Sequence, residues 1–196
     1  MADFKVVPKV TYANSLITGR ARATLKVPGG VQPYDPTPVS FGQMSRLEPR
    51  KLPAPAGLTV AEADVEVPGV ERLGGSGGST QWKFKGGDIV LNVTISVYII
   101  DKYAPVPAIF KVIMEHEYLH VLDYQTLANS TFSRLIAADS TLQPWLAGGT
   151  WTGDAFYAQL LTVWGRKAQQ LGDTRDSGAT YERHKQEIMK LAAANL

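Results

Sequence analysis

Near its middle the sequence reads Val112-Ile-Met-Glu-His-Glu-Tyr-Leu-His-Val-Leu-Asp123, in which His116, Glu117 and His120 form the pattern H-E-x-x-H. On a helix, side chains four residues apart leave nearly the same face, so the two imidazoles would lie one turn apart. Two neutral imidazoles so placed can provide two ligands of a tetrahedral Zn²⁺ site. Glu117 would lie beside them and accept a proton from a water on the metal. The stretch therefore predicts His116 and His120 as metal ligands and Glu117 as a general base.

The flanking sequence predicts the helix that this pattern needs. Residues 107–128 contain no glycine and no proline after Pro107, and apolar residues recur at helical spacing. Pro105 and Pro107 suit a helix entrance, where a missing N–H costs little. The alternative is that two ordinary polar histidines fall on a helix by chance. However, the chain has three histidines in all, and buried imidazoles need partners.

The composition is that of one globular domain, or one domain with a long arm. Of 196 residues, 44% are hydrophobic and 19% are charged. A net charge of +2 with scattered basic residues argues against nucleic-acid binding. No run is long and apolar enough to predict insertion into a membrane, and the absence of cysteine excludes thiolate ligands. No cleavable signal is seen, so we expect a cytoplasmic protein, or one exported or packaged by a signal-independent route.

The first half of the chain is rich in predicted strands. Alternating residues predict strands at 4–10, 20–27, 58–67, 81–84 and 88–100. Gly86-Gly87 is predicted to be a hairpin turn between the last two. The strand 88–100 alternates most clearly, with Leu91, Val93, Ile95, Val97 and Ile99 on one face. If this strand is an exposed edge, it could pair with an extended peptide.

Two segments of this half differ in composition. Residues 28–55 contain seven prolines, so neither regular helix nor central strand is expected there. We expect an extended arm that lies on a surface of this chain or of a protein partner. Residues 74–79 read Gly-Gly-Ser-Gly-Gly-Ser and are predicted to be a flexible loop or linker.

The second half is predicted to be helical. Beyond the H-E-x-x-H helix, helices are expected at 132–138, 154–171 and 180–194, with a loop at 144–153 and a break at 172–178. The predicted class is therefore α+β. Residues 1–79 would hold strands, the arm and the Gly/Ser loop, and residues 80–196 would form the core with the active-site helix at about 107–128.

A catalytic zinc needs a third protein ligand, and the sequence leaves several candidates. His184 is the remaining histidine and the first choice, a solvated surface histidine being the alternative. Asp176 and Asp154 are the other candidates, although each stands at a helix entrance where N-capping would also explain it. Asp123 follows His120 by one turn and is expected to support a ligand rather than bind metal.

The motif resembles the active-site pattern of zincin metallopeptidases. The wider arrangement resembles a bacterial family of secreted zinc-dependent proteases of unknown function, in the strand with Trp82 and Phe84, the long strand 90–100, the motif helix and a late Thr-x-His-Gly-like element. Here that element reads Thr174-Arg-Asp-Ser-Gly-Ala-Thr180, so Asp176 or Ser177 replaces the histidine of the family. The resemblance implies a zincin-like fold.

A weaker resemblance is to aspzincins, whose pattern Gly-Thr-x-Asp-x-x-Tyr supplies an aspartate as third ligand. The sequence Gly149-Thr-Trp-Thr-Gly-Asp-Ala-Phe-Tyr157 is similar to it with two extra residues. This resemblance implies Asp154 as the third ligand.

Two functions are weighed. The first is a zinc metallopeptidase that hydrolyses a peptide or protein through a metal-bound water, with Glu117 as base and Tyr157 or Tyr181 supporting the oxyanion. The second is a catalytically reduced, zincin-like structural or interaction component of a larger assembly of the phage or injection-apparatus type. Such a component would use residues 28–55 to contact its neighbours. Stoichiometric zinc would favour the first function.

Overall fold

The structure, a computed structural model, describes residues 3–13, 23–27, 30–34, 37–47 and 56–195 of the chain. They belong to two compact units, each built from three stretches of sequence. The first unit contains residues 1–11, 62–94 and 125–170, and the second contains residues 12–61, 95–124 and 171–196. Each unit draws on both halves of the chain, so the units do not coincide with the predicted division at residue 79. The α+β class is confirmed, with strands mainly before residue 100 and helices after it.

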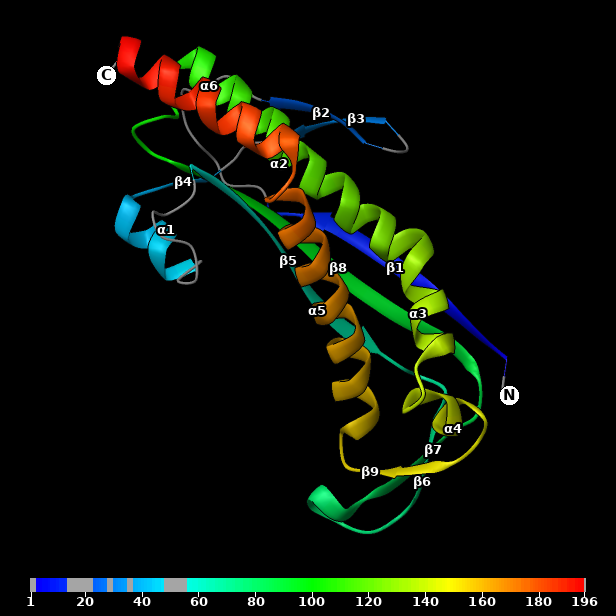
Figure 1. The fold of residues 1–196 in the computed structure, drawn as a ribbon. Coiled ribbons are helices and arrows are strands. Elements are labelled where there is room, and N and C mark those ends of the chain that lie inside the picture. The colour runs from blue at the N-terminus through cyan, green and yellow to red at the C-terminus, as the bar shows by residue number, and fades with distance from the viewer. Residues whose placement is uncertain (1–2, 14–22, 28–29, 35–36, 48–55, 196) are drawn as a thin grey trace. The chain divides into compact units, whose positions relative to one another are not determined.

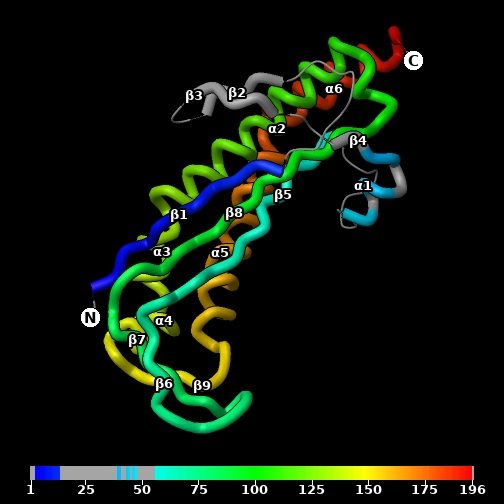
Figure 2. The backbone as a smooth tube through the Cα atoms, turned by 180° about the vertical axis from the view of Figure 1, so that it is seen from behind, coloured from blue at the N-terminus to red at the C-terminus, as the bar shows by residue number. Residues whose placement is uncertain are grey.

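A four-stranded sheet is organised around the long strand β8. Its strands are β1 (Phe4–Tyr12), β8 (Gly87–Ile100), β4 (Thr37–Val39) and β5 (Gly57–Glu66). Strand β8 pairs with each of the other three. Figure 2 shows β8 between β1 and β5. The predicted alternation is confirmed, since the inward residues from Leu91 to Ile99 are at most 1% exposed.

The prediction that β8 could be an exposed edge is wrong. At its end, the Ile100 N–H donates to the Ala56 carbonyl and the Asp101 N–H donates to the Val39 carbonyl. Successive residues of a strand direct their backbone groups to opposite edges, so β8 has a neighbour on each side here. An added peptide would have to use a different strand.

A second sheet lies in the first unit. It is antiparallel, in the order β6 (Val70–Gly74), β7 (Gln81–Phe84), β9 (Thr150–Thr152). Trp82 of β7 pairs with Arg72 and Trp151, so the predicted hairpin between β7 and β8 is wrong. Gly86 and Gly87, with φ of 103° and 101°, carry the chain from one sheet to the other instead. Alternation reveals a strand, but it does not reveal the strand's partner.

The helices of the first unit follow the prediction in part. Helix α3 (Phe132–Ala138) has the predicted bounds and follows a π-helical turn at Leu127–Thr131. The predicted loop at 144–153 is wrong, because α4 (Leu142–Leu146) and β9 occupy much of it. Helix α4 begins where the Asp139 carboxylate accepts the N–H groups of Thr141 and Leu142. Helix α5 (Ala155–Arg175) continues through Gly172, beyond its predicted end.

The proline-rich stretch is more regular than predicted where it is described. It contains β3 (Gly30–Tyr34), which pairs with β2 (Ala23–Val27), as well as β4 and α1 (Phe41–Leu47). Ser40 and Gln43 exchange backbone-to-side-chain hydrogen bonds of 2.7 and 3.3 Å, a capping box that starts α1. Val39 and Met44 are buried with Ile100 in a small core of the second unit. The other residues of 28–55, and positions 20–22 of the predicted second strand, lie outside the described residues.

The second unit also contains the H-E-x-x-H helix and the last helix. They are α2 (Pro107–Thr126) and α6 (Ala179–Asn195), which lie side by side in Figures 1 and 2. Helix α6 exposes most of its surface, and its Met189 is 57% exposed. Its one buried residue among those described is His184. No helix in the described part of the chain has the length and apolarity to cross a membrane.

Candidate metal site

The two histidines of the motif converge on one point. They lie one turn apart on α2, both are buried, and their Nε2 atoms are 3.2 Å apart. Asp176 Oδ1 lies 3.0 Å from His116 Nε2 and 2.9 Å from His120 Nε2. The ligand atoms of these three residues all lie within 4.8 Å of one another.

The donor set and its spacing fit a zinc ion. A tetrahedral site with bonds of about 2.1 Å separates its ligand atoms by about 3.4 Å. The observed separations of 2.9 to 3.2 Å are close to this value. The site offers two imidazole nitrogens and one carboxylate oxygen, all directed at one another. A divalent cation between them would bind all three atoms as ligands. His116, His120 and Asp176 are therefore the residues that could hold a metal.

Asp176 is brought to the histidines by the end of α5. Its N–H donates to the Gly172 carbonyl at 2.9 Å, which continues the helical turn by one residue. The preceding residue, Arg175, donates two hydrogen bonds to the Asp123 carboxylate on α2. Asp123 therefore contacts the residue that precedes Asp176, and the supporting role predicted for it stays a prediction. Helix α6 begins at Ala179, and Asp176 Oδ1 lies between the two histidines.

Glu117 is held by strand β5. It is 3% exposed, and the Thr59 hydroxyl donates to its Oε2 at 2.7 Å. A Cβ atom on Gly57 would lie 2.6 Å from Glu117 Oε1 and 2.6 Å from Ile113 Cγ2. Position 57 therefore has room for glycine alone. The hydrogen bond fixes the position of Oε2 in the carboxylate.

A pocket opens beside these residues, entirely within the second unit. Ala56, Gly57 and Ile113 line one part of it, next to His116, Glu117 and Asp176. The rest is lined by three residues of α6, namely Tyr181, His184 and Lys185. Residues three and four apart share a face of a helix, which is why all three reach the same pocket.

Tyr181 contributes a phenol to the lining of this pocket. Its ring centroid lies 5.4 Å from that of His116. Burial raises its pKa above the ordinary value of 10.0, and the negative charges of Glu182 and Glu117 raise it further. The phenol therefore keeps its proton at neutral pH. Tyr157, the other predicted candidate, belongs to the first unit and packs against Phe156.

His184, the first choice for the third ligand, lies next to the metal group without belonging to it. It is buried, its ring centroid is 5.7 Å from that of His116, and its Nδ1 has no hydrogen-bond partner among the described residues. The alternative of a solvated surface histidine is wrong. The geometry favours Asp176, and Asp154 belongs to the first unit, where its carbonyl accepts the Ala158 N–H.

Several residues of the site escaped the sequence analysis. Thr59 and Gly57 are about sixty positions from Glu117 in the chain, and no local pattern marks them. Lys185 could have been found by its helical spacing from Tyr181, which the sequence analysis had named. Arg175 carried no signal, because its partner Asp123 lies 52 residues away.

Comparisons with known proteins identified no related protein. No protein-family model matches the chain, and no curated protein or solved structure matches it significantly. The resemblance to zincin proteases therefore rests on the motif and its surroundings, and it stays a prediction.

Proposed function

We propose that the protein is a zinc-dependent metallopeptidase with a zincin-like active site. One observation carries the proposal: His116, His120 and Asp176 bring three ligand atoms within 4.8 Å, with the Glu117 carboxylate on the same helix. Zinc held there would polarise a peptide carbonyl and acidify a water molecule. The order of strand, short connection and motif helix, from β8 to α2, supports the zincin-like assignment.

Glu117 is the general base of the proposed reaction. The hydrogen bond from Thr59 fixes Oε2 and leaves Oε1 as the oxygen beside Gly57, in the pocket wall. It takes the proton of the attacking water and then delivers it to the leaving amine. Tyr181 is the donor that stabilises negative charge on the carbonyl oxygen, because its raised pKa keeps the phenol protonated.

Strand β5 is the proposed place for the peptide. Among the described strands it pairs with β8 alone, and its first residue, Gly57, lies in the pocket wall. An extended peptide could add to the second edge of β5 by backbone hydrogen bonds, which brings its carbonyl groups towards Glu117. This replaces the expectation that β8 would receive the substrate.

The experiment combines metal content with hydrolysis. The purified chain should contain about one zinc per molecule by mass spectrometry and should cleave a library of unstructured peptides. Glu117→Gln should retain the zinc and lose hydrolysis, because the amide cannot accept the proton. Asp154→Asn, an acid of the first unit, is the control and should change neither. A protein that binds no zinc, or a Glu117→Gln variant with full turnover, would overturn the proposal.

The second hypothesis, an interaction component with a reduced site, gains little support from the arm. Its described residues Val39 and Met44 are buried in the core of their own unit, so they are not available to a partner. The zinc measurement separates the two hypotheses, since a component without a working site has no need of stoichiometric metal.

A further inference from the structure

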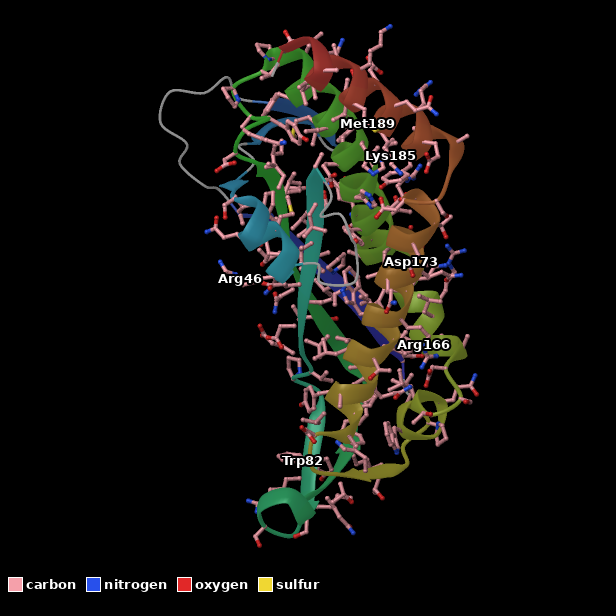
Figure 3. The ribbon with its side chains drawn as sticks, turned by 60° about the vertical axis from the view of Figure 1, so that its left-hand side comes forward. Arg46, Trp82, Arg166, Asp173, Lys185 and Met189 are labelled. Carbon is pink, nitrogen blue, oxygen red and sulfur yellow. The ribbon has the colours of Figure 1, made fainter. Side chains whose placement is uncertain are left out.

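Lys185 is the one cationic side chain among the described residues that line the pocket. It lies on α6 directly after His184 and four residues after Tyr181 (Figure 3). Its Nζ lies 5.9 Å from the centroid of the Tyr181 ring, a loose cation–π contact at the pocket wall. No carboxylate of the described residues forms an ion pair with it, although Glu182 and Glu187 are on the same helix. The ammonium group is therefore free to receive an anion.

With a divalent ion bound, the positive charge of Lys185 is not balanced by a carboxylate of the pocket lining. The carboxylates of Asp176 and Glu117 would balance the charge of one divalent ion bound between the ligands. With that ion in place, the ammonium of Lys185 is the unbalanced charge among the side chains that line the pocket, Glu182 lying outside that lining. A positive group on a pocket wall attracts an anionic group of the ligand and repels a cationic one.

We propose that Lys185 is a specificity-determining residue that binds a carboxylate of the substrate close to the scissile bond. The inference rests on the proposed peptidase function. The carboxylate is either an acidic side chain or the C-terminal carboxylate of a short peptide. A lysine ammonium is a point charge on a flexible stem and accepts either geometry, whereas a guanidinium fork would impose a bidentate one.

Matched peptides distinguish the two sources. One series replaces Asp by Asn at each position flanking the bond, and the other replaces the free C-terminus by the amide. The carboxylate form should have a KM lower by about two- to five-fold, with kcat little changed, because Lys185 is exposed and solvent screens its attraction. The series in which this preference appears identifies the source.

The variants show whether Lys185 causes the preference. Lys185→Met should abolish it, while Lys185→Arg should restore part of it. Lys190→Met is the matched control, because Lys190 is an exposed lysine of the same helix that does not line the pocket. A Lys185→Met variant that keeps the preference, or loses activity equally on all peptides, would overturn the inference.

A binding measurement separates this inference from the proposed function. Calorimetry with the inactive Glu117→Gln protein should show tighter binding of the carboxylate peptides than of their neutral partners, and Lys185→Met should remove that difference. If the wild type hydrolyses no peptide but this difference is present, the proposed function fails and the carboxylate site stands. If hydrolysis occurs without any carboxylate preference, the function stands and the role of Lys185 is refuted.

Discussion

Arg175 donates hydrogen bonds of 2.9 and 2.7 Å from Nε and Nη2 to the two carboxylate oxygens of Asp123. This bidentate pair joins the end of α5 to the helix that carries His116 and His120, one residue before Asp176. A two-point contact fixes orientation as well as distance. The ion pair therefore restrains the chain next to Asp176, the proposed third ligand.

The first prediction is that this pair controls metal affinity without binding metal. Arg175→Ala should weaken zinc binding by about 10–100-fold, the usual cost of losing a partner that orients a ligand. Arg175→Lys should also weaken it, since an ammonium cannot reproduce the fork. Competition with a chromogenic chelator measures the affinity.

Arg166→Ala is the control for this prediction. Arg166 is an exposed arginine of the same helix α5, but it belongs to the first unit. Its loss should leave zinc affinity unchanged. Equal affinities for wild type and Arg175→Ala would show that Asp176 is positioned without the ion pair.

The second prediction identifies the third ligand. Asp176→Ala should reduce zinc affinity more than the Arg175 variants do, because it removes a ligand atom that lies 3.0 and 2.9 Å from the two histidine nitrogens. His184→Ala should retain stoichiometric zinc, because His184 is outside the ligand group. The metal content of both variants, measured by mass spectrometry, shows whether Asp176 or His184 is the third ligand. Loss of zinc in His184→Ala with retention in Asp176→Ala would restore the original sequence-based choice.

The third prediction concerns the space beside Glu117. A Cβ atom at position 57 would approach both Glu117 Oε1 and Ile113 Cγ2 to 2.6 Å. Gly57→Ala should therefore lower the free energy of unfolding by about 1–3 kcal/mol and impair hydrolysis by displacing the base. Chemical denaturation and peptide cleavage measure the two effects.

Gly165→Ala is a matched control for that substitution. Gly165 is exposed in α5, and nothing lies within 4 Å of the added Cβ. Alanine is the better helix former, so this change should raise stability by up to about 1 kcal/mol. If Gly57→Ala were as stable and as active as Gly165→Ala, Glu117 and Ile113 would be able to move aside for the added methyl group, contrary to this prediction.

The fourth prediction concerns alkaline pH. The pKa of Tyr181 is raised above 10.0 by burial and by nearby negative charge, and burial likewise raises the pKa of Tyr12 and Tyr157. A phenol with a raised pKa in the folded state binds its proton more tightly there than in the unfolded chain. Its contribution to stability is full below about pH 10 and is lost as the pH rises through the folded-state value.

Denaturant titrations across the alkaline range check this prediction. The free energy of unfolding should be insensitive to these three tyrosines up to about pH 10 and should fall above it. Tyr181→Phe should remove part of that fall and, at neutral pH, lower kcat through loss of the donor. A Tyr181→Phe variant with unchanged kcat would remove this tyrosine from the proposed mechanism.

Local patterns in the sequence anticipated the elements that local physics determines. The helical spacing of apolar residues without glycine or proline placed α2 and its motif, and strict alternation placed β8 and its buried face. Helix α3 was also placed with its observed bounds. Each of these signals depends on residues within a few positions of one another, where the period of the backbone is visible.

Pairings between residues distant in the chain could not be predicted from local sequence patterns. The alternation of β7 and β8 could not show that they belong to different sheets, and the proline content of 28–55 concealed β4, which pairs in parallel with β8 over three residues. Prolines are tolerated where a strand is short and at the end of a ladder, so their number overstated the loss of regular structure.

By itself, the sequence determined the α+β class and the motif helix, and it named His116, Glu117 and His120 as the candidate reactive set. Tertiary structure alone decided which distant residues complete the site. Asp176 and His184 were both plausible from their chemistry, and the turn at the end of α5, next to the bidentate contact of Arg175 with Asp123, brings Asp176 onto the histidines. Likewise, Thr59 reaches Glu117 across 58 positions. The physical reason is that ligand geometry depends on separations of about 3 Å between side chains on different elements, which no local periodicity encodes.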